Sequence, residues 1–216
     1  MKKETFKRIL SSIILIPIAL FFIIKGSFFF NFFVIICFLI TSYEWHMMSK
    51  KKSYYFLGLA FLIFSFYTVY ELRHISGDES LSLFLFITLI CVSTDIGGYI
   101  FGKIFKGPKL TKLSPNKTYS GMIGGYLLSI IFVEFFFNKY TYLFGLDDID
   151  FSLESFIIVL LISTVSQIGD IIISYYKRLS KIKDTGKIIP GHGGILDRID
   201  GMIFAFPFAF ILEKFI

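Results

Sequence analysis

The chain has 216 residues, enough for one or two domains, but its composition is not that of a soluble protein. Hydrophobic residues make up 55% of it and charged residues 18%, against roughly 45–50% and roughly 25% in a typical globular domain. With 29 Phe, 5 Pro and 2 Cys, the composition excludes a disordered chain, a collagen and a disulfide scaffold. One soluble core cannot cover this much apolar surface, so we expect the chain to lie in a lipid bilayer.

Seven continuous apolar segments follow one another along the chain. A helical span needs roughly 20 apolar residues, with about 17 as the lower limit, and continuous runs favour helices over the alternating strands of a membrane barrel. The first and last segments are short and contain Pro17 and Pro207, and the first two leave a re-entrant pair as an alternative. We predict an all-α, polytopic membrane protein with about seven transmembrane helices: Ile9–Ile24, Ser27–Ser42, Tyr54–Tyr70, Leu81–Gly102, Gly121–Asn138, Phe156–Tyr176 and Gly201–Phe215.

Basic residues are concentrated in alternate loops between these segments. The net charge of +6 would suggest nucleic acid as a partner in a soluble protein. Here it is better explained by basic loops beside membrane spans, so we expect no nucleic acid. If the N-terminus is cytoplasmic, 18 of the 22 Lys and Arg residues lie on the cytoplasmic side, as the positive-inside rule requires. The basic N-terminus resembles a signal peptide, but no small-residue cleavage site follows it, so we expect a retained first span.

Residues suited to chemistry lie in the second part of the chain. We therefore divide it into N-terminal membrane helices, residues 1–80 with about three spans, and a catalytic membrane domain, residues 81–216 with about four spans and two cytoplasmic loops. Cys37 and Cys91 lie inside apolar runs and are expected to be packing residues. His46 and His74 lie near span ends, where a structural role is expected.

Acidic residues inside the expected spans are the first candidates for a site. Asp95 and Asp170 would each lie roughly 10 Å below the cytoplasmic surface, where a carboxylate must be paired, solvated or metal-bound. Their matching depth predicts one cytoplasm-facing polar cavity, with separate structural ion pairs as the alternative. Glycines beside Asp95 and Asp170 would allow close helix packing. Asp197 and Asp200 share one face of the last helix, where capping is the alternative role. Together these carboxylates predict a hard-cation site such as Mg²⁺ with substrate phosphates.

Two basic loops are the second set of candidates. The loop before the last span combines dense cations with a glycine-rich turn, which suits a polyanion and its metal, although a solvated basic loop would look similar. Its candidate residues are Lys177, Arg178, Lys183, Asp184, His192, Gly193, Gly194 and Arg198. The loop after the fourth span contains Ser114, Lys117 and Thr118, but positive-inside bias alone would put lysines there. No Walker A pattern occurs, which excludes a P-loop nucleotide fold.

The stretch from Ser174 to Asp200 resembles the signature of phosphatidate cytidylyltransferases, also called CDP-diacylglycerol synthases. Asp95–Tyr99 and Ser114–Thr118 are similar to further motifs of that family, so the resemblance covers the chain from about Ser93 onward. Tyr119 and Ser120 stand where the family often has Trp-Glu, and Lys103 stands where Arg is common. The chain is short for the family, from which we expect one or two N-terminal spans to be missing. The signature itself is matched at Ser174, Lys177-Arg178, Lys183-Asp184, Gly186, Ile189-Pro190, His192-Gly193-Gly194-Ile195 and Asp197-Arg198-Ile199-Asp200.

The resemblance implies that CTP and phosphatidate react to give CDP-diacylglycerol and pyrophosphate at a Mg²⁺-dependent site, to which K⁺ is an optional addition. It implies that Asp170 and Asp197 bind the metal. The expected catalytic residues are Asp170, Asp197, Lys177, Arg178, Lys183, Asp184, His192 and Arg198. The expected substrate-binding residues are Lys117, Ser114, Thr118, Gly193, Gly194, Ser174, Asp95 and Asp200. The resemblance also suggests a homodimer in the cytoplasmic membrane, with the active site facing the cytoplasm.

Two other functions remain as alternatives. A CTP-dependent polyprenol kinase would transfer the γ-phosphate and release CDP. A cation-coupled transporter could use Asp95 and Asp170 as a relay, but the polar residues lie near one membrane face, which disfavours it. CDP-alcohol phosphotransferases are disfavoured because their Asp-Gly-x₂-Ala-Arg motif is absent.

Overall fold

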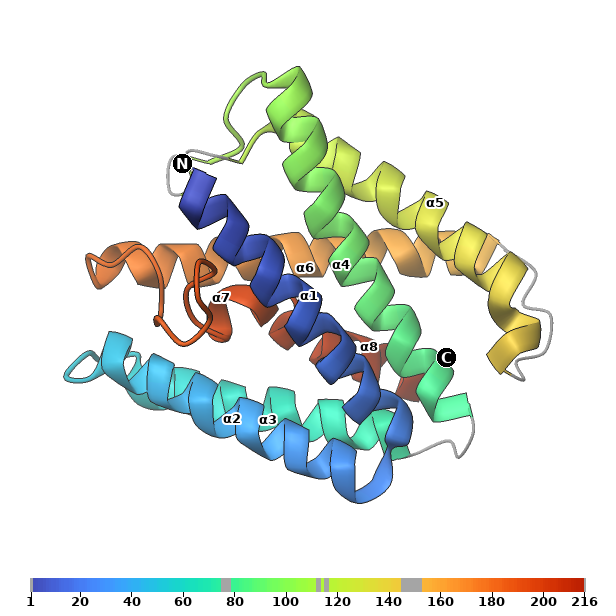
Figure 1. Cartoon of the computed structure of the whole chain (residues 1–216), viewed down its shortest axis with the longest axis horizontal. Helices are drawn as coiled ribbons and strands as arrows, with labels where there is room; N and C mark the ends of the chain where they lie inside the picture. The colour runs from blue at the N-terminus through green and yellow to red at the C-terminus, as the bar shows by residue number, and fades with distance from the viewer. Residues whose placement is uncertain (1, 75–78, 112–113, 115–116, 145–152, 216) are drawn as a thin grey trace. The chain divides into compact units, whose positions relative to one another are not determined.

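The protein is built from helices (Figure 1). The computed structural model describes residues 2–74, 79–111, 114, 117–144 and 153–215, and no strand occurs among them. Two isolated bridges, Lys109–Thr118 and Ile189–Gly193, are the only extended pairing in those ranges. The predicted all-α class is confirmed. The helices are α1 (Lys2–Lys25), α2 (Ser27–Ser49), α3 (Tyr55–His74), α4 (Glu79–Phe105), α5 (Tyr119–Phe144), α6 (Leu153–Leu179), α7 (Leu196–Ile199) and α8 (Met202–Phe215).

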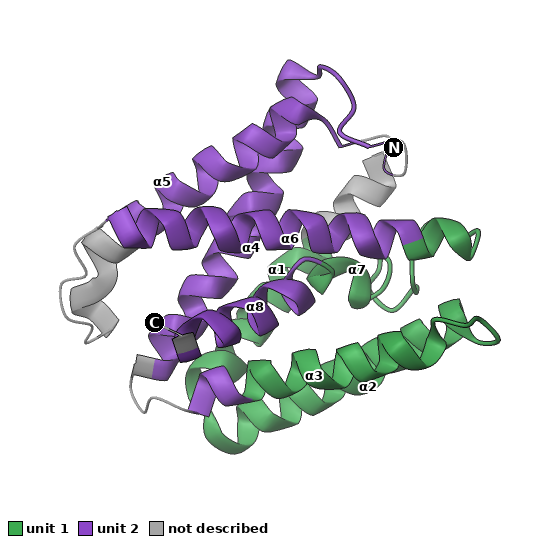
Figure 2. Cartoon of the chain, turned by 180° about the vertical axis from the view of Figure 1, so that it is seen from behind, with its two compact units in different colours: residues 1–70, 176–200 green, residues 71–175, 201–216 purple. Residues whose placement is uncertain are grey.

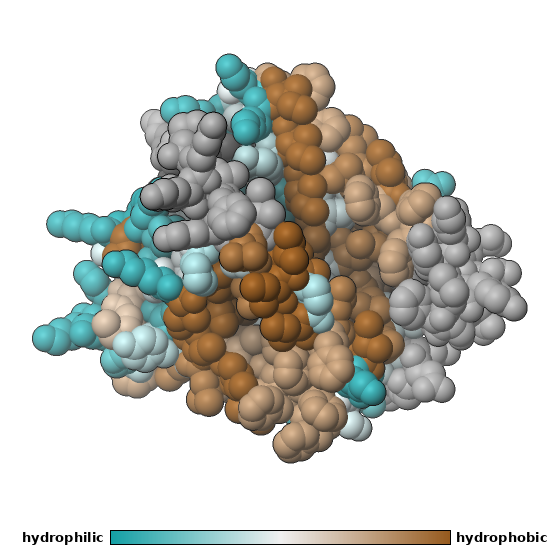
Figure 3. All heavy atoms as spheres, viewed as in Figure 1, coloured by the Kyte–Doolittle hydropathy of each residue, from teal (hydrophilic) through white to brown (hydrophobic). Residues whose placement is uncertain are grey.

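Helices α2 to α6 are long and apolar enough to cross a membrane, which confirms a polytopic membrane protein. The apolar part of α1 is shorter, at Leu10–Lys25, and α8 has 14 residues. The count of seven spans therefore stays a prediction. Large apolar side chains are exposed on these helices, as the brown surface of Figure 3 shows. Phe28, Phe56 and Leu57 are 74%, 77% and 71% exposed. Lipid tails, not water, are the solvent that such a surface suits.

Helix α2 extends further than its hydropathy predicts. The apolar run ends near Ser42, but the helix ends at Ser49. In this last part, Ser49 Oγ donates to the Trp45 carbonyl of the preceding turn at 2.6 Å. The extension carries Glu44 and Trp45.

The described chain forms two compact units, and neither is continuous in sequence (Figure 2). The first comprises residues 1–70 and 176–200, and the second comprises residues 71–175 and 201–216. Helix α6 belongs to the second unit up to Tyr175, and its last residues belong to the first. The division at residue 80 that we expect from the sequence stays a prediction.

In the first unit, an aromatic cluster fixes the start of the loop that follows α6. Trp45 lies edge-on to Tyr54 and Tyr176, with ring centroids 6.1 and 5.3 Å apart, and its indole donates to the Tyr55 carbonyl at 3.0 Å. Ser180 Oγ donates to the Met48 carbonyl at 2.8 Å. The loop after α6 is thus attached to the end of α2 at its first residues.

In the second unit, glycines let α4 and α5 pack with their backbones almost in contact. A Cβ atom on Gly97 would lie 2.3 Å from the Gly124 carbonyl oxygen, and one on Gly121 would lie 2.7 Å from that of Gly98. Such small-residue contacts are how membrane helices approach closely. This is the packing that the glycines beside Asp95 predict. It holds the described residues between α4 and α5, which are 106–111, 114, 117 and 118, at one end of this helix pair.

Candidate active site

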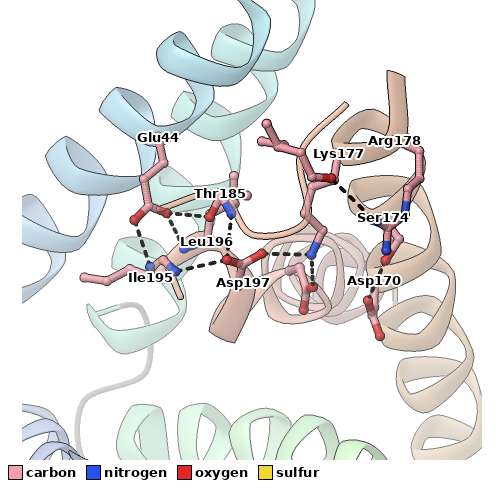
Figure 4. Close-up of polar contacts among 12 residues, drawn as sticks. Glu44, Asp170, Ser174, Lys177, Arg178, Thr185, Ile195, Leu196 and Asp197 are labelled. Carbon is pink, nitrogen blue, oxygen red and sulfur yellow. Dashed lines mark hydrogen bonds and ion pairs between the residues drawn. The ribbon is translucent and has the colours of Figure 1, made fainter. Parts of the chain in front are cut away.

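A buried cluster of charged side chains lies in the first unit, where the end of α6 meets α7 (Figure 4). Lys177 Nζ lies 2.8 Å from Asp197 Oδ1 and 3.9 Å from Asp200 Oδ2. The three residues are only 9%, 8% and 7% exposed. A buried ion pair repays its desolvation only when further hydrogen bonds complete it. The second oxygen of Asp197 supplies these bonds.

Asp197 Oδ2 accepts two backbone N–H groups, from Thr185 at 2.8 Å and from Gly194 at 3.0 Å. Burial by itself raises the pKa of the Asp197 carboxyl. The hydrogen bond from Lys177, its charge and the two N–H donors outweigh burial, so that the pKa lies below its ordinary value. Asp197 is therefore ionised at neutral pH and links three segments of the chain: α6, the loop and α7.

A second carboxylate, Glu44 of α2, holds the same loop and was missed in the sequence. Glu44 is 2% exposed. Its Oε1 accepts the N–H of Ile195 at 3.0 Å, and its Oε2 accepts the Thr185 hydroxyl at 2.9 Å and the N–H of Leu196 at 2.8 Å (Figure 4). The signal that could have found it is an acid within the helical extension of an apolar segment. Ending that span at Ser42 placed Glu44 outside it.

The glycines of the loop make room for these two carboxylates. A Cβ on Gly194 would lie 2.5 Å from Glu44 Oε2, and one on Gly186 would lie 2.6 Å from Glu44 Oε1. Gly193 has φ +90°, a left-handed conformation, and its Cβ would lie 2.8 Å from Asp197 Oδ2.

The N–H groups of Gly193 and Gly194 are already paired inside the protein. Gly193 donates to the Ile189 carbonyl at 3.2 Å, and Gly194 donates to Asp197. Their donation to substrate phosphate stays a prediction, and it would require these bonds to open.

A separate ion pair lies in the second unit. Lys117 Nζ lies 2.5 Å from Asp170 Oδ2, and the two side chains are 22% and 28% exposed. Ser174 Oγ donates to Asp170 Oδ1 at 3.3 Å, and Lys117 also donates to the Gln167 carbonyl at 3.4 Å. The structure thus brings the predicted loop lysine to the predicted aspartate of α6. Asp170, Ser174 and Lys177 are spaced by four and three residues, so they lie on one face of that helix.

Two other predicted residues of the loop before α5 organise its backbone. Thr118 Oγ1 accepts the N–H of Gly121 at 3.1 Å, which caps the start of α5. The Ser114 N–H donates to Thr111 Oγ1 at 3.1 Å, and its carbonyl accepts the N–H of Lys117 at 3.0 Å. Both residues therefore stabilise the turn from which Lys117 extends.

The remaining predicted residues are more accessible. His192 Nδ1 lies 2.8 Å from Ser11 Oγ of α1, a contact that the sequence does not reveal. Arg178 donates to the Ile182 carbonyl at 3.3 Å. Exposed side chains are those of Asp95, Arg178, Lys183, Asp184 and Arg198.

No disulfide joins Cys37 and Cys91, which are free and lie on α2 and α4. His46 Nδ1 lies 3.1 Å from the Tyr55 hydroxyl, a structural contact. In the described part of the chain, no group of three or more His, Cys, Asp and Glu side chains is arranged to hold a metal ion. The predicted metal site therefore stays a prediction.

The fold is that of a polytopic helical membrane protein, and buried carboxylate–lysine contacts lie beside a glycine-rich basic loop. These are the features of a membrane-embedded enzyme that acts on charged substrates. Residues 56–216 match the sequence model of the cytidylyltransferase family, and the chain belongs to that family.

Named relatives support this assignment. The chain is 34% identical over 189 residues to a phosphatidate cytidylyltransferase of Staphylococcus saprophyticus and 37% identical over 186 residues to one of Staphylococcus aureus. In both comparisons 81% of this chain is aligned, and it spans 65% of the length of the relative. A phosphatidate cytidylyltransferase of Rickettsia felis is 34% identical over 224 residues, covering 98% of this chain and 93% of the relative.

Proposed function

We propose that this protein is a phosphatidate cytidylyltransferase, which transfers the cytidylyl group of CTP to phosphatidate and releases pyrophosphate. One observation carries the proposal: the signature from Ser174 to Asp200 folds so that Lys177, Asp197 and Asp200 form one buried charged cluster. The three relatives described above are each named phosphatidate cytidylyltransferase.

In the proposed reaction, a phosphate oxygen of phosphatidate attacks the α-phosphorus of CTP. A new P–O bond forms, and the bond to the β-phosphate oxygen breaks as pyrophosphate leaves. The nucleophile is already an anion, so no strong base is required. Positioning and charge neutralisation then supply most of the rate enhancement. We assign phosphate binding to Lys117 and to the exposed Arg178, Lys183 and Arg198.

Lys177 is also assigned to phosphate, but its ammonium lies against Asp197 and Asp200. In that position it neutralises the buried carboxylates. His192, Asp184, Asp95 and the loop glycines complete the proposed site, with His192 contacting a phosphate or orienting an acid. Ser174 contributes by its hydrogen bond to Asp170.

Mg²⁺ is the cofactor that we propose, with K⁺ as an optional second ion, and Asp170 and Asp197 would hold it. A carboxylate offers about four lone-pair positions. The contacts above fill two of them at Asp170 and three at Asp197, so both can still take a cation. When bound, Mg²⁺ would neutralise the triphosphate and the leaving pyrophosphate.

We further propose that the N-terminus and the site face the cytoplasm, and that the protein is a homodimer of the cytoplasmic membrane. The charge bias of the loops supports this orientation. It would give the site access to cytosolic CTP and to the headgroup of a membrane lipid.

The test uses the purified chain in detergent or lipid, with phosphatidate, α-labelled CTP, and Mg²⁺ present or absent. We expect label to enter the lipid fraction and pyrophosphate to be released, both only with Mg²⁺. A parallel reaction with polyprenol tests the kinase, which would leave the label in soluble CDP and yield an unlabelled phosphorylated lipid.

The Asp170→Asn variant tests the metal assignment. Its carboxamide keeps the shape of the side chain but removes the charge that faces Lys117, so we expect Mg²⁺-dependent turnover to fall by at least a hundredfold. Near-normal turnover with an unchanged Mg²⁺ dependence would refute the assignment.

A further inference from the structure

Glu44 joins the N-terminal part of the chain to the loop that carries the signature residues. It lies on α2, before the segment that matches the family model at residues 56–216. Thr185 lies six residues after the end of α6 at Leu179, whereas Ile195 and Leu196 lie where the loop ends and α7 begins. One carboxylate therefore holds the two ends of a ten-residue excursion, residues 185–194.

The bonds of Glu44 complement those of Asp197. At Thr185, the hydroxyl donates to Glu44 and the backbone N–H donates to Asp197. At the other end, Gly194 donates to Asp197, and the next two N–H groups donate to Glu44. Together, Glu44 and Asp197 accept all five of these hydrogen bonds. Asp197 cannot move relative to Lys177 without disturbing the loop that Glu44 holds.

The charge and shape of Glu44 are both required for these contacts. All three donors point at carboxylate oxygens, and Oε2 receives two of them. In a Gln side chain, one oxygen becomes an NH₂ group, which cannot accept a backbone N–H. The Thr185 hydroxyl can turn and accept from that NH₂, but the N–H of Ile195 or of Leu196 is left without an acceptor in a buried place. The unpaired group is expected to displace the loop from Glu44.

We propose that Glu44 is a positioning residue for the transfer reaction: it fixes the loop 180–195 and α7 so that Asp197, as a metal ligand, and the loop cations are placed for the substrate phosphates. The inference rests on the proposed cytidylyltransferase activity. It assigns part of the active-site construction to α2, a helix otherwise expected only to anchor the chain. A displacement of about 1 Å at a reacting group reduces turnover by about a hundredfold. We therefore expect substitution of Glu44 to lower kcat.

The experiment compares Glu44→Gln with wild type, using phosphatidate, α-labelled CTP and Mg²⁺. We expect kcat to fall ten- to hundredfold, with a smaller change in the KM for phosphatidate. Glu134→Gln is the matched control, since Glu134 is an exposed acid on the apolar helix α5; its kcat should stay within twofold of wild type. Glu44→Asp keeps the charge but is one methylene shorter, and it should recover only part of the activity.

Thr185→Val separates positioning from general destabilisation. This variant removes the hydroxyl donor but keeps the N–H that binds Asp197. If Glu44 acts through the loop, Thr185→Val should lower kcat in wild type and have almost no further effect in Glu44→Ala, where the hydroxyl has lost its partner. Additive losses, or a Glu44→Gln variant with kcat within twofold of wild type, would overturn the proposal.

Hydrogen exchange tests the anchoring of the loop by Glu44 without relying on the proposed activity. In Glu44→Gln, peptides covering residues 185–196 should exchange faster than in wild type, while peptides from the middle of α6 should not change. If wild type transfers no cytidylyl group, the proposed function fails. Faster exchange of the loop would then still support its anchoring by Glu44, and unchanged exchange would overturn it.

Discussion

Replacing Lys177 by Met removes the cation from the buried cluster and tests the central contact of the structure. Lys177 Nζ lies 2.8 Å from Asp197 Oδ1 and 3.9 Å from Asp200 Oδ2, and each residue is less than a tenth exposed. Breaking a buried pair by removing one partner costs about 3–5 kcal/mol, because the other charge stays buried without compensation. Asp197 keeps its two backbone N–H donors, so we expect a loss near the lower end, about 3 kcal/mol.

The assay is unfolding of the purified protein in detergent, followed by helical circular dichroism at pH 7. Lys187→Met is the control, because Lys187 is exposed on the loop that the cluster fixes. That variant should lie within about 0.5 kcal/mol of wild type. A Lys177→Met variant no less stable than this control would refute the view that the pair holds α6 to α7.

The pH dependence of the same variants provides a second check. The pKa of Asp197 in the folded protein is below its ordinary value, so its ionisation stabilises the fold above the unfolded pKa of about 4. That contribution is lost as the pH falls through the folded pKa. Without Lys177, the pKa of Asp197 rises and its protonation relieves the unpaired charge. The stability gap between wild type and Lys177→Met should therefore narrow between about pH 5 and pH 3, and a constant gap would contradict the explanation.

Three glycine substitutions test close packing, two of them between α4 and α5 in the second unit and one beside Glu44 in the first. Gly97→Ala would place its Cβ 2.3 Å from the Gly124 carbonyl oxygen and should lower stability by about 1–3 kcal/mol. Gly98→Ala is the control, because the nearest atom to its Cβ would lie 3.7 Å away. It should be neutral or slightly stabilising in the same unfolding assay. Gly186→Ala would place its Cβ 2.6 Å from Glu44 Oε1, so it should destabilise wild type by a similar amount of about 1–3 kcal/mol. It should cost far less in a Glu44→Ala background, and equal losses in the two backgrounds would show that Glu44 does not occupy that space.

The amino-acid sequence by itself determined the class of the protein and the position of its helices. Continuous apolar runs predict membrane helices because hydropathy and backbone hydrogen bonding are local properties. All seven expected spans coincide with helices, including those that contain Pro17 and Pro207. The second expected span, Ser27–Ser42, is shorter than helix α2, which continues to Ser49.

The signature pattern also identified the family before the fold was known, since its charged residues and glycines are read directly from the chain. Comparison with the family model and with named relatives confirms that membership. The roles assigned to single signature residues stay predictions.

Only the tertiary structure decided which charge meets which partner. The contacts that build the site join residues far apart in sequence: Lys177 with Asp197, Lys117 with Asp170, and Glu44 with Thr185 and Leu196. A local pattern shows that a buried acid needs donors, but it does not say which segment supplies them. The physical reason is that pairing depends on how helices pack. Helix packing places Glu44 of α2 against the loop. The loop glycines, which lack side chains, leave room there for the carboxylates.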